Sequence, residues 1–390
     1  MAKNKQDASL LADYLRNPTA HDNDTRERLI ATCQDVIASL ETPIEATRKH
    51  AFLTLDHAVV RCAIQLNIFS ILSQEERCYS TRELAVATSP PCNDVLLSRL
   101  LRYLVSPLRL VEEKGNGLWK GTARGSLLAQ DGFKAGCSMY FDSGGPAFQA
   151  LPKWICTQED EQAQSAFQLA LPNEDGFFTW LEKDEHKIQS FHRWMETLSG
   201  YQFCAQDVIN IQKWIPGTSS ENDVVFVDVG GGTGGQSIIL ASRRGACLGR
   251  IVNEDISHVP QEAQAVLSSH HIDHIAYDFF DEQPIKGACI YHFRQIFHDW
   301  PDEDCEKILR RTKEAMTAVS TLLIDEVVLP EKGAHWMVMQ RDLTMMALFN
   351  AAERSEIQWR ALLQQAGLRI EEIRCYDKRM AACIIVAKLI

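Results

Sequence analysis

The spacing of hydrophobic residues changes near residue 216. Before it, apolar residues mostly recur every three or four positions, which predicts helices that pack by one face. Beyond it, short apolar runs such as VVFVDVG, RIVNED and ACIYHFR alternate with helical patterns. Alternating strands and helices predict a largely parallel sheet with helices on both faces. We therefore expect an α/β fold in which a doubly wound, Rossmann-like domain, residues 216–390, follows a mainly helical part.

The first 125 residues are predicted to form a small helical domain. We expect a long helix over residues 48–72, shorter helices over 80–89 and 93–106, and a hairpin that turns at Gly115-Asn116-Gly117. Three helices followed by a hairpin are the order of a winged helix. The polar residues 1–45, which contain a further helical stretch, could pack on a partner subunit or on their own chain.

The third helix of this domain differs from a DNA-recognition helix. Recognition helices are basic, whereas Arg99 and Arg102 lie here among four leucines. The chain also carries a net charge of −12, which repels phosphate backbones. We expect this helix to form a packed surface, and we expect no nucleic-acid partner.

Residues 126–215 are predicted to be a helical connecting segment that is rich in aromatic side chains. Such a segment can cover the pocket of a small acceptor molecule, although most of these rings would also suit an ordinary core. The aromatic residues are Tyr140, Phe141, Phe148, Trp154, Phe167, Phe177, Phe178, Trp180, Phe191 and Trp194.

The cysteines and the apolar runs indicate a compartment. Twelve cysteines are scattered without any C-x-x-C pair, so neither a metal-ligand spacing nor a disulfide framework is present. Free thiols suit a reducing cytosol. No run approaches the roughly 20 apolar residues of a membrane span, and the first residues, MAKNKQDASLLADYL, lack the apolar stretch of a secretory signal. We expect a cytoplasmic protein with no membrane partner and no metal.

A glycine run follows the first strand of the predicted sheet. Residues Gly230 to Gly235 read GGGTGG, and a helix is expected from about Gln236. Consecutive glycines at this place let the backbone approach a ligand closely. By itself the run would serve NAD, FAD or another nucleotide equally well.

Acids at the ends of the next strands narrow that choice. Asp255 ends the second strand pattern, where a carboxylate can accept the ribose hydroxyls of an adenosine. Asp278 ends the third, where it could accept the adenine amino group, and Phe279 could lie on the adenine face. Each acid alone would more often be a cap or turn residue. Together they favour an adenosine-containing ligand, because ligands bind beyond the carboxyl ends of such strands.

His298 is the candidate general base. It lies between the fourth strand and a helix that is acidic at its start, so it belongs to the same sheet edge as the glycine run. A helix N-terminus disfavours imidazolium, which predicts a neutral ring that can accept a proton. Glu326, which ends the fifth strand pattern, and Glu353, which precedes a helix that Ser355 and Gln358 can cap, are expected to hold the ring.

These motifs, in this order, resemble a known family. DVGGGTGG, EDISHV, YDFF, FHDWPDEDC, IDEVVLP and ERSEIQWRALLQQAGL look like the plant and fungal small-molecule O-methyltransferases of the caffeate and flavonoid type. The resemblance covers most of the chain, including the winged-helix domain, and implies S-adenosyl-L-methionine as cofactor. It also implies a homodimer built through the N-terminal domain.

The resemblance assigns roles to individual residues. His298 would be the catalytic base, with Glu326 and Glu353 as the acids beside it. The acceptor, a small hydroxylated molecule, would meet Met195 and Asp299. No metal is implied, and no cluster of carboxylates at the acceptor site is expected. The residues assigned to the cofactor are Gly230, Gly232, Asp255, Asp278, Phe279, Arg294 and Ser199.

Three other functions remain open at this stage. An enzyme of the same fold could bind the cofactor and steer a pericyclic rearrangement without transferring methyl, although it would not need a base. A dehydrogenase would explain the glycines but not the HDW segment with its two glutamates. A DNA-binding regulator would use the winged helix against the acidic charge. The acceptor segment matches the family only loosely, so the sequence leaves the acceptor among aromatic, polyketide and enol natural products.

Overall fold

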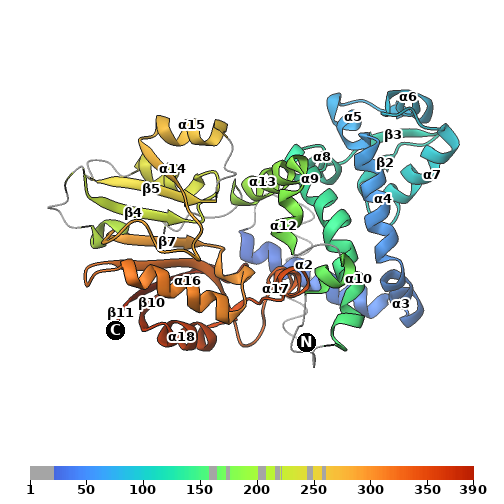
Figure 1. Ribbon diagram of the computed structural model, residues 1–390. Coiled ribbons are helices and arrows are strands. Elements are labelled where there is room, and N and C mark those ends of the chain that lie inside the picture. The colour runs from blue at the N-terminus through green and yellow to red at the C-terminus, as the bar shows by residue number, and fades with distance from the viewer. Residues whose placement is uncertain are drawn as a thin grey trace. The chain divides into compact units, whose positions relative to one another are not determined.

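The computed structural model describes residues 22–157, 165–172, 176–200, 208–215, 220, 222–243, 249–256 and 261–390, without the side chains of residues 23, 199 and 200. Two compact units, divided after Gly125, make up the chain. Figure 1 shows their elements. Among the described helices, none is by itself long and apolar enough to cross a membrane, although α4 and α5 reach that length and composition together across a bend of 58°.

The first unit has the expected helices and hairpin. Three short strands form its sheet in the order β1-β3-β2, and β2 and β3 are the predicted hairpin. Its elements are α2 (Asn23–Leu40), α3 (Pro43–Ala51), α4 (Leu53–Gln65), α5 (Ile68–Gln74), β1 (Tyr79–Ser80), α6 (Thr81–Ala87), α7 (Asp94–Val105), β2 (Val111–Glu113), β3 (Leu118–Gly121) and α8 (Ala123–Leu127).

The prediction of one continuous helix over residues 48–72 is wrong. The chain breaks at Phe52 and again at Asn67, so that α3, α4 and α5 replace one helix. Asn67 adopts a left-handed conformation with φ of 55°, which asparagine tolerates better than most residues. Across the break at Asn67 the apolar periodicity continues, because α4 and α5 both bury apolar side chains, whereas α3 buries none.

Several apolar side chains of this unit face solvent. Leu29 on α2 is buried, but the rest of the apolar set that predicted this helix is largely exposed. Contiguous exposed apolar side chains are typical of an interaction surface. The set comprises Ile30, Val36, Ile37, Leu40, Ile44, Phe52, Leu53 and Leu55.

The second unit begins with the predicted helical segment. Its aromatic rings pack together, with Phe167, Phe177 and Trp180 at the centre. The helix α17 (Trp336–Phe349), which comes much later in the chain, packs against α10 and α11 of this segment. The segment consists of α9 (Asp131–Met139), the π-helix η1 (Tyr140–Gly144), α10 (Gly145–Trp154), α11 (Ala166–Ala170), α12 (Phe177–Glu182), α13 (Glu185–Gly200) and the 3₁₀ turn η3 (Ile211–Trp214).

A twisted sheet forms the rest of this unit, with strand order β10-β11-β8-β7-β4-β5-β6. The five strands from β8 to β6 are parallel, and β11 pairs antiparallel with both β8 and β10. The carboxyl ends of the parallel strands therefore share one edge. The strands are β4 (Val224–Val229), β5 (Arg250–Asp255), β6 (Ile272–Ala276), β7 (Ile290–Arg294), β8 (Thr321–Leu329), β9 (Arg354–Ser355), which pairs beside β8, β10 (Leu368–Asp377) and β11 (Ala382–Leu389).

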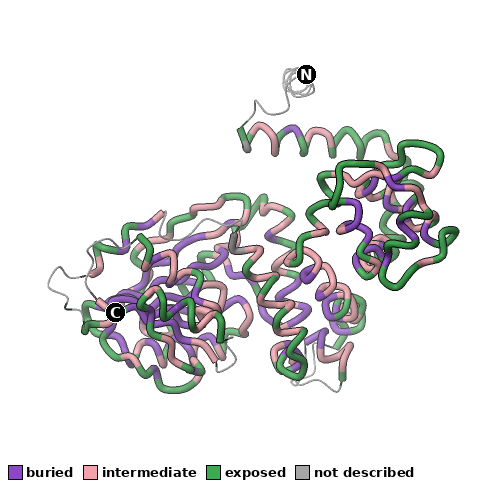
Figure 2. The backbone as a smooth tube through the Cα atoms, turned by 90° about the horizontal axis from the view of Figure 1, so that it is seen from above, coloured by how far each residue is buried: buried purple, intermediate pink, exposed green. Residues whose placement is uncertain are grey.

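Helices cover both faces of the sheet, as the alternating pattern predicted. The helices α14 (Gly235–Arg243) and α15 (Gln261–Ser269) lie on one face, and α16 (Asp302–Ala315) and α18 (Glu356–Gln365) on the other (Figure 1). Leu240 and Leu267 bury against the first face, and Leu309 and Trp359 against the second. Buried backbone accordingly concentrates in the strands between these layers (Figure 2).

A polar network fixes the middle strands of the sheet. His292 Nδ1 on β7 lies 2.8 Å from Asp228 Oδ1 on β4, and Ser237 Oγ on α14 donates to the other carboxylate oxygen at 2.9 Å. All three side chains are buried. A satisfied buried network of this kind specifies one register between strands and helix.

Candidate active site

The glycine run passes from β4 over the end of β5. The backbone N–H groups of Gly230 and Gly231 donate to the carbonyl oxygen of Glu254 at 2.8 and 3.0 Å. Gly230 has φ of +69°, and a Cβ built there would lie 2.5 Å from Cδ1 of Ile296. Only glycine combines this φ with so close an approach. Because Ile296 precedes His298 by two residues, the glycine run and the histidine segment are in direct contact.

The predicted Gly232 and Asp255 lie together at this edge. Asp255 Oδ2 accepts a hydrogen bond from the N–H of Gly232 at 2.7 Å, and Oδ1 accepts one from the N–H of Ile256 at 2.8 Å. A carboxylate oxygen has more than one lone pair, so each oxygen can accept more than one hydrogen bond. A Cβ at Gly232 would meet nothing within 4 Å. A carboxylate beside open glycine backbone is a donor and acceptor set that fits an adenosine ribose.

Asp278 and Phe279 lie on the loop after β6. The strand ends at Ala276, two residues earlier than the pattern predicted, and Asp278 is an exposed turn residue that accepts from the N–H of Phe280 at 3.0 Å. Phe279 is half-buried and lies 3.8 Å from the position of a Cβ on Gly230. The structure thus places the Phe279 ring against the glycine run, whereas the Asp278 carboxylate accepts a hydrogen bond within its own turn.

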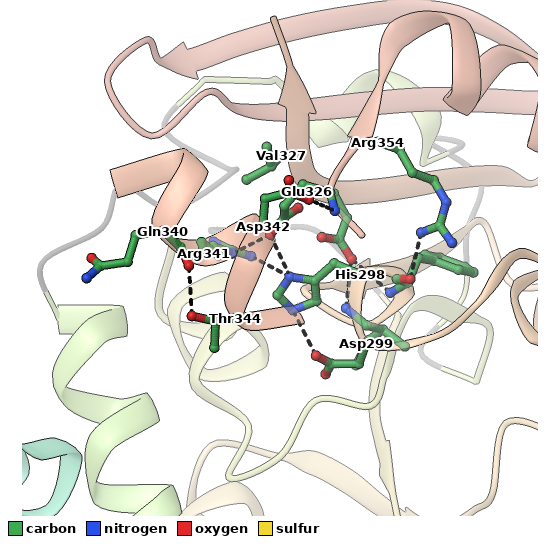
Figure 3. A network of polar contacts seen from close by, with 12 residues as sticks. His298, Asp299, Glu326, Val327, Gln340, Arg341, Asp342, Thr344 and Arg354 are labelled. Carbon is green, nitrogen blue, oxygen red and sulfur yellow. Dashed lines mark hydrogen bonds and ion pairs between the residues drawn. The ribbon is translucent and has the colours of Figure 1, made fainter. Parts of the chain in front are cut away.

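His298 lies in the 3₁₀ turn η4 (Phe297–Asp299) between β7 and α16 and is 7% exposed. Its Nδ1 lies 2.9 Å from Oε1 of Glu353, which is buried just before β9. Figure 3 shows the His298 ring between Arg341 and Asp299. Asp299 Oδ1 stands 3.5 Å from Nε2, which is too long for a good hydrogen bond. Asp299, which was predicted to contact the acceptor molecule, therefore lies at the Nε2 edge of the ring.

Glu326 holds the backbone of this turn. Its Oε1 accepts hydrogen bonds from the N–H groups of Ile296 at 2.8 Å and Phe297 at 2.9 Å. The prediction that Glu326 ends its strand is wrong, because β8 continues to Leu329. The residues after Glu326 pair with β11 and β9. The apolar pattern alone did not show that the strand continues through these residues. Glu326 is 2% exposed.

Two arginines of the site were missed by the sequence reasoning. Arg341 on α17 lies 2.6 Å from Glu353 Oε1 through Nε and 2.9 Å from His298 Nδ1 through Nη2. Arg354 is 4% exposed and donates to the carbonyl oxygens of Phe297 at 2.7 Å and Trp300 at 2.8 Å. A signal existed in both cases, because Arg354 follows Glu353 directly and Arg341 interrupts an apolar helix.

The charges around His298 set its protonation. Burial lowers the pKa of the imidazole, but the carboxylates of Asp299, Glu326 and Glu353 outweigh burial and raise that pKa to about 9. The prediction of a ring kept neutral by the helix N-terminus is therefore wrong near neutral pH. The dipole of one helix is weaker than three nearby carboxylates.

The acids divide into two kinds. Burial raises the pKa of Glu326 to about 7 and that of Asp299 to about 6. Burial also acts to raise the pKa of Glu353, but Arg341 and His298 overcome it and bring that pKa to about 2. Glu353 is accordingly the permanent negative charge at the Nδ1 side of the ring.

The expectation that carboxylates do not cluster at the acceptor site is also wrong. Ligand atoms of His298, Glu326 and Glu353 lie within 4.8 Å of one another, a grouping that could in principle hold a cation. The guanidinium of Arg341 already contacts two of these three residues. A metal ion would meet a fixed positive charge there, so we assign none to the site.

The remaining predicted residues are less well defined. Arg294 ends β7, and its Nη1 lies 3.5 Å from Asp325 Oδ2. Met195 is half-buried on α13, beside Trp194, whose ring meets Tyr140 edge to face at 6.2 Å. The side chain of Ser199 lies outside the described residues.

Aromatic rings connect the helical segment to the His298 turn. Phe178 on α12 stacks on Trp300 with ring centroids 6.3 Å apart and on Phe349 with centroids 5.2 Å apart. Phe279 meets Trp300 edge to face at 5.8 Å. One aromatic wall thus runs from the helical segment to the ring beside the glycine run.

Comparison with known proteins identifies the family. Residues 148–369 match the O-methyltransferase domain, and residues 49–131 match the O-methyltransferase dimerisation domain. The O-methyltransferase apf6 of Gibberella fujikuroi is 62% identical over 338 residues, which cover 86% of this chain and 96% of that protein.

Two solved structures share the whole fold. LepI in complex with SAM is 28% identical, with a TM-score of 0.87 and complete coverage of both chains. A structure described as a pericyclic reaction enzyme is 29% identical, with the same TM-score, and covers 99% of this chain and 100% of that one. The match of the family models and of apf6 over most of the sequence decides the assignment: this chain belongs to the plant and fungal S-adenosylmethionine-dependent O-methyltransferase family.

Proposed function

We propose that this enzyme transfers the methyl group of S-adenosyl-L-methionine to a hydroxyl of a small aromatic, polyketide or enol natural product, with His298 as general base. The contact between Ile296 and Gly230 is the observation that carries the proposal. It puts the candidate base two residues from a side chain that touches the candidate cofactor loop. Base and methyl donor would then serve the same acceptor oxygen.

The cofactor would lie along the sheet edge. Asp255 would accept the ribose hydroxyls, Gly230 and Gly232 would let the backbone approach, and Phe279 would lie against the adenine. Asp278, Arg294 and Ser199 are further proposed contacts. When bound, the cofactor supplies a methyl group on a sulfonium that is open to in-line attack by oxygen.

The residues of this chain would align the acceptor and remove its proton. Met195, Asp299 and the aromatic wall would hold a flat acceptor with its hydroxyl at Nε2 of His298. A phenol has a pKa of about 10, so direct transfer to an imidazole of pKa about 9 is uphill by only about 1.4 kcal/mol. Glu353 at Nδ1 would stabilise the imidazolium that forms.

A rearrangement without methyl transfer is the second candidate, because a pericyclic reaction enzyme shares the fold. His298 with Glu353 and Arg341 around it favours methyl transfer, since a rearrangement needs no proton acceptor. Incubation with isotopically labelled cofactor and a panel of phenols and enols separates the two. We expect labelled product heavier by one CH₂ group, whereas a product of unchanged mass would support the rearrangement.

We also propose a homodimer in the cytosol. The match to the dimerisation domain, residues 49–131, includes the exposed apolar side chains of Phe52, Leu53 and Leu55. The described cysteines are all free, which suits a reducing compartment. A monomer in light scattering at micromolar concentration would contradict the dimer.

A further inference from the structure

Arg341 contacts both His298 and Glu353, and the function proposed above does not say what its charge does. It and Asp342 are the only charged residues of α17, whose sequence is WMVMQRDLTMMALF. The Arg341 side chain is 16% exposed and contacts both Glu353 and His298. Figure 3 shows it directed at the His298 ring. Asp342 accepts from the backbone N–H of Glu353 at 2.9 Å, so α17 holds Glu353 at two points.

The Nδ1 atom of His298 faces two groups with opposite demands. Glu353 only accepts hydrogen bonds, and the Arg341 guanidinium only donates them; both lie 2.9 Å away. If Nδ1 carries the proton, it donates to Glu353, and Nε2 keeps the lone pair that a base needs. If Nε2 carries the proton, Nδ1 accepts from Arg341 and the ring cannot act as a base. The doubly protonated ring faces a like charge at Arg341.

We propose that Arg341 is a positioning residue for proton removal: by holding Glu353 and opposing the imidazolium, it makes His298 release its proton within the working pH range. This inference rests on the proposed function of His298 as base. The charged groups that face the ring are Asp299 from η4, Glu326 from β8, Glu353 from the loop before β9 and Arg341 from α17. Tyr140 from η1 lies near Asp299 and Arg341 in turn.

The balance of these charges explains why one arginine matters. Three carboxylates stabilise the imidazolium, and Arg341 is the positive side chain among these groups that opposes it. Without that charge the ring would stay protonated to higher pH, and a smaller fraction of the enzyme would hold a competent base. Each pH unit of such a shift lowers the competent fraction about tenfold at a given pH below the pKa.

A structural role alone would give a different result. An arginine that only neutralises buried Glu353 would lower thermal stability when removed but leave the pH dependence in place. Arg341→Met removes the charge, Arg341→Gln removes it while keeping an amide that can reach Glu353, and Arg341→Lys keeps it. Arg360→Met is the matched control, because Arg360 forms an exposed ion pair with Glu356 on α18.

The test measures the titration of His298 directly. Histidine is labelled with ¹⁵N in the intact enzyme with S-adenosylhomocysteine added, and His298→Ala identifies the resonance. We expect Arg341→Met and Arg341→Gln to raise the pKa of His298 by about one unit or more and to shift the acid limb of kcat/KM equally. Arg341→Lys, which keeps the positive charge, should cause little of this shift, and Arg360→Met should cause none.

Two outcomes are decisive. An unchanged pKa of His298 in either charge-removing variant overturns the proposal, and Arg341→Gln serves if Arg341→Met does not fold. If no acceptor is ever methylated, the proposed function fails, but the NMR titration still decides the role of Arg341.

Discussion

Oε1 of Glu326 lies 2.8 Å from the backbone nitrogen of Ile296 and also accepts the next N–H, that of Phe297. The buried acid that the sequence suggested as a partner of the imidazole ring therefore organises the turn that carries the ring. Its charge still acts on His298 through space. Backbone geometry and base strength are thus set by one side chain.

Glu326 can be tested by separating these two effects. In Glu326→Gln the amide oxygen can still accept both N–H groups, but the negative charge is lost, so the acid limb of kcat/KM should move to lower pH. In Glu326→Ala two backbone donors lose their acceptor, and turnover should fall at every pH. Equal pH profiles for Glu326→Gln and the natural enzyme would contradict an electrostatic effect of Glu326 on the pKa of His298.

The pH dependence of the natural enzyme follows from the pKa of His298. A base must be deprotonated to act, and burial, outweighed by the surrounding carboxylates, leaves this pKa at about 9. We expect kcat/KM to rise about tenfold per pH unit from pH 7 and to level off near pH 9. A kcat/KM that is already level at pH 7 would contradict this assignment, because this ratio reports the protonation of the enzyme before the acceptor binds.

Arg354 should support the active turn without taking part in the chemistry. Arg354→Met removes the guanidinium hydrogen bonds to the carbonyl oxygens of Phe297 and Trp300, each worth about 0.5–1.5 kcal/mol net, and leaves them the longer contacts from Cys305 Sγ at 3.3 Å. We expect a lower Tm and a lower kcat at all pH values. Arg360→Met, which removes an exposed arginine, should change neither.

The contact between Gly230 and Ile296 gives a test of the cofactor loop. Gly230→Ala forces a Cβ to 2.5 Å from Cδ1 of Ile296 at a left-handed φ, which costs about 1–2 kcal/mol before the clash. Affinity for S-adenosylhomocysteine, measured by calorimetry, should fall. Adding Ile296→Val removes the clashing methyl and should recover part of the loss; no recovery would place the effect in the backbone alone.

Glu254 offers a pH test of stability that is independent of catalysis. Burial raises its pKa from 4.5 to about 7, so the folded state binds a proton that the unfolded state releases between these values. Its contribution to stability is therefore lost as pH rises from about 4.5 to 7, at up to about 1.4 kcal/mol per unit. In denaturant titrations, Glu254→Gln should gain stability over the natural enzyme as pH rises through this window.

Sequence patterns predicted the architecture because buried apolar residues recur at a regular spacing along helices and strands. The strand runs and the capping box of Ser355 with Gln358 both appear in the structure. Breaks inside apolar helices leave no such trace, so Phe52 and Asn67 were missed. Whether Glu326 ends or continues a strand depends on pairing with β11 and β9, which are distant in sequence.

The sequence predicted which acids and which histidine form the site, but it did not predict the balance of charges around His298. His298, Glu353 and the glycine run come together as expected, because parallel strands end at one edge. The arginines come from α17 and from the end of the loop that follows it, and their contacts are tertiary. Because the pKa of the His298 ring depends on Arg341 and the clustered carboxylates, it could not be predicted from the neighbouring helix alone.

The central claim is that His298 removes the acceptor's proton next to the bound methyl donor. The most direct measurement is the single-turnover rate at which His298→Ala transfers a labelled methyl group. The affinity of the same variant for S-adenosylhomocysteine is measured in parallel. We expect the transfer rate to fall by about 10² to 10⁴ while the affinity stays within about twofold. A variant that transfers methyl at the natural rate would contradict the account.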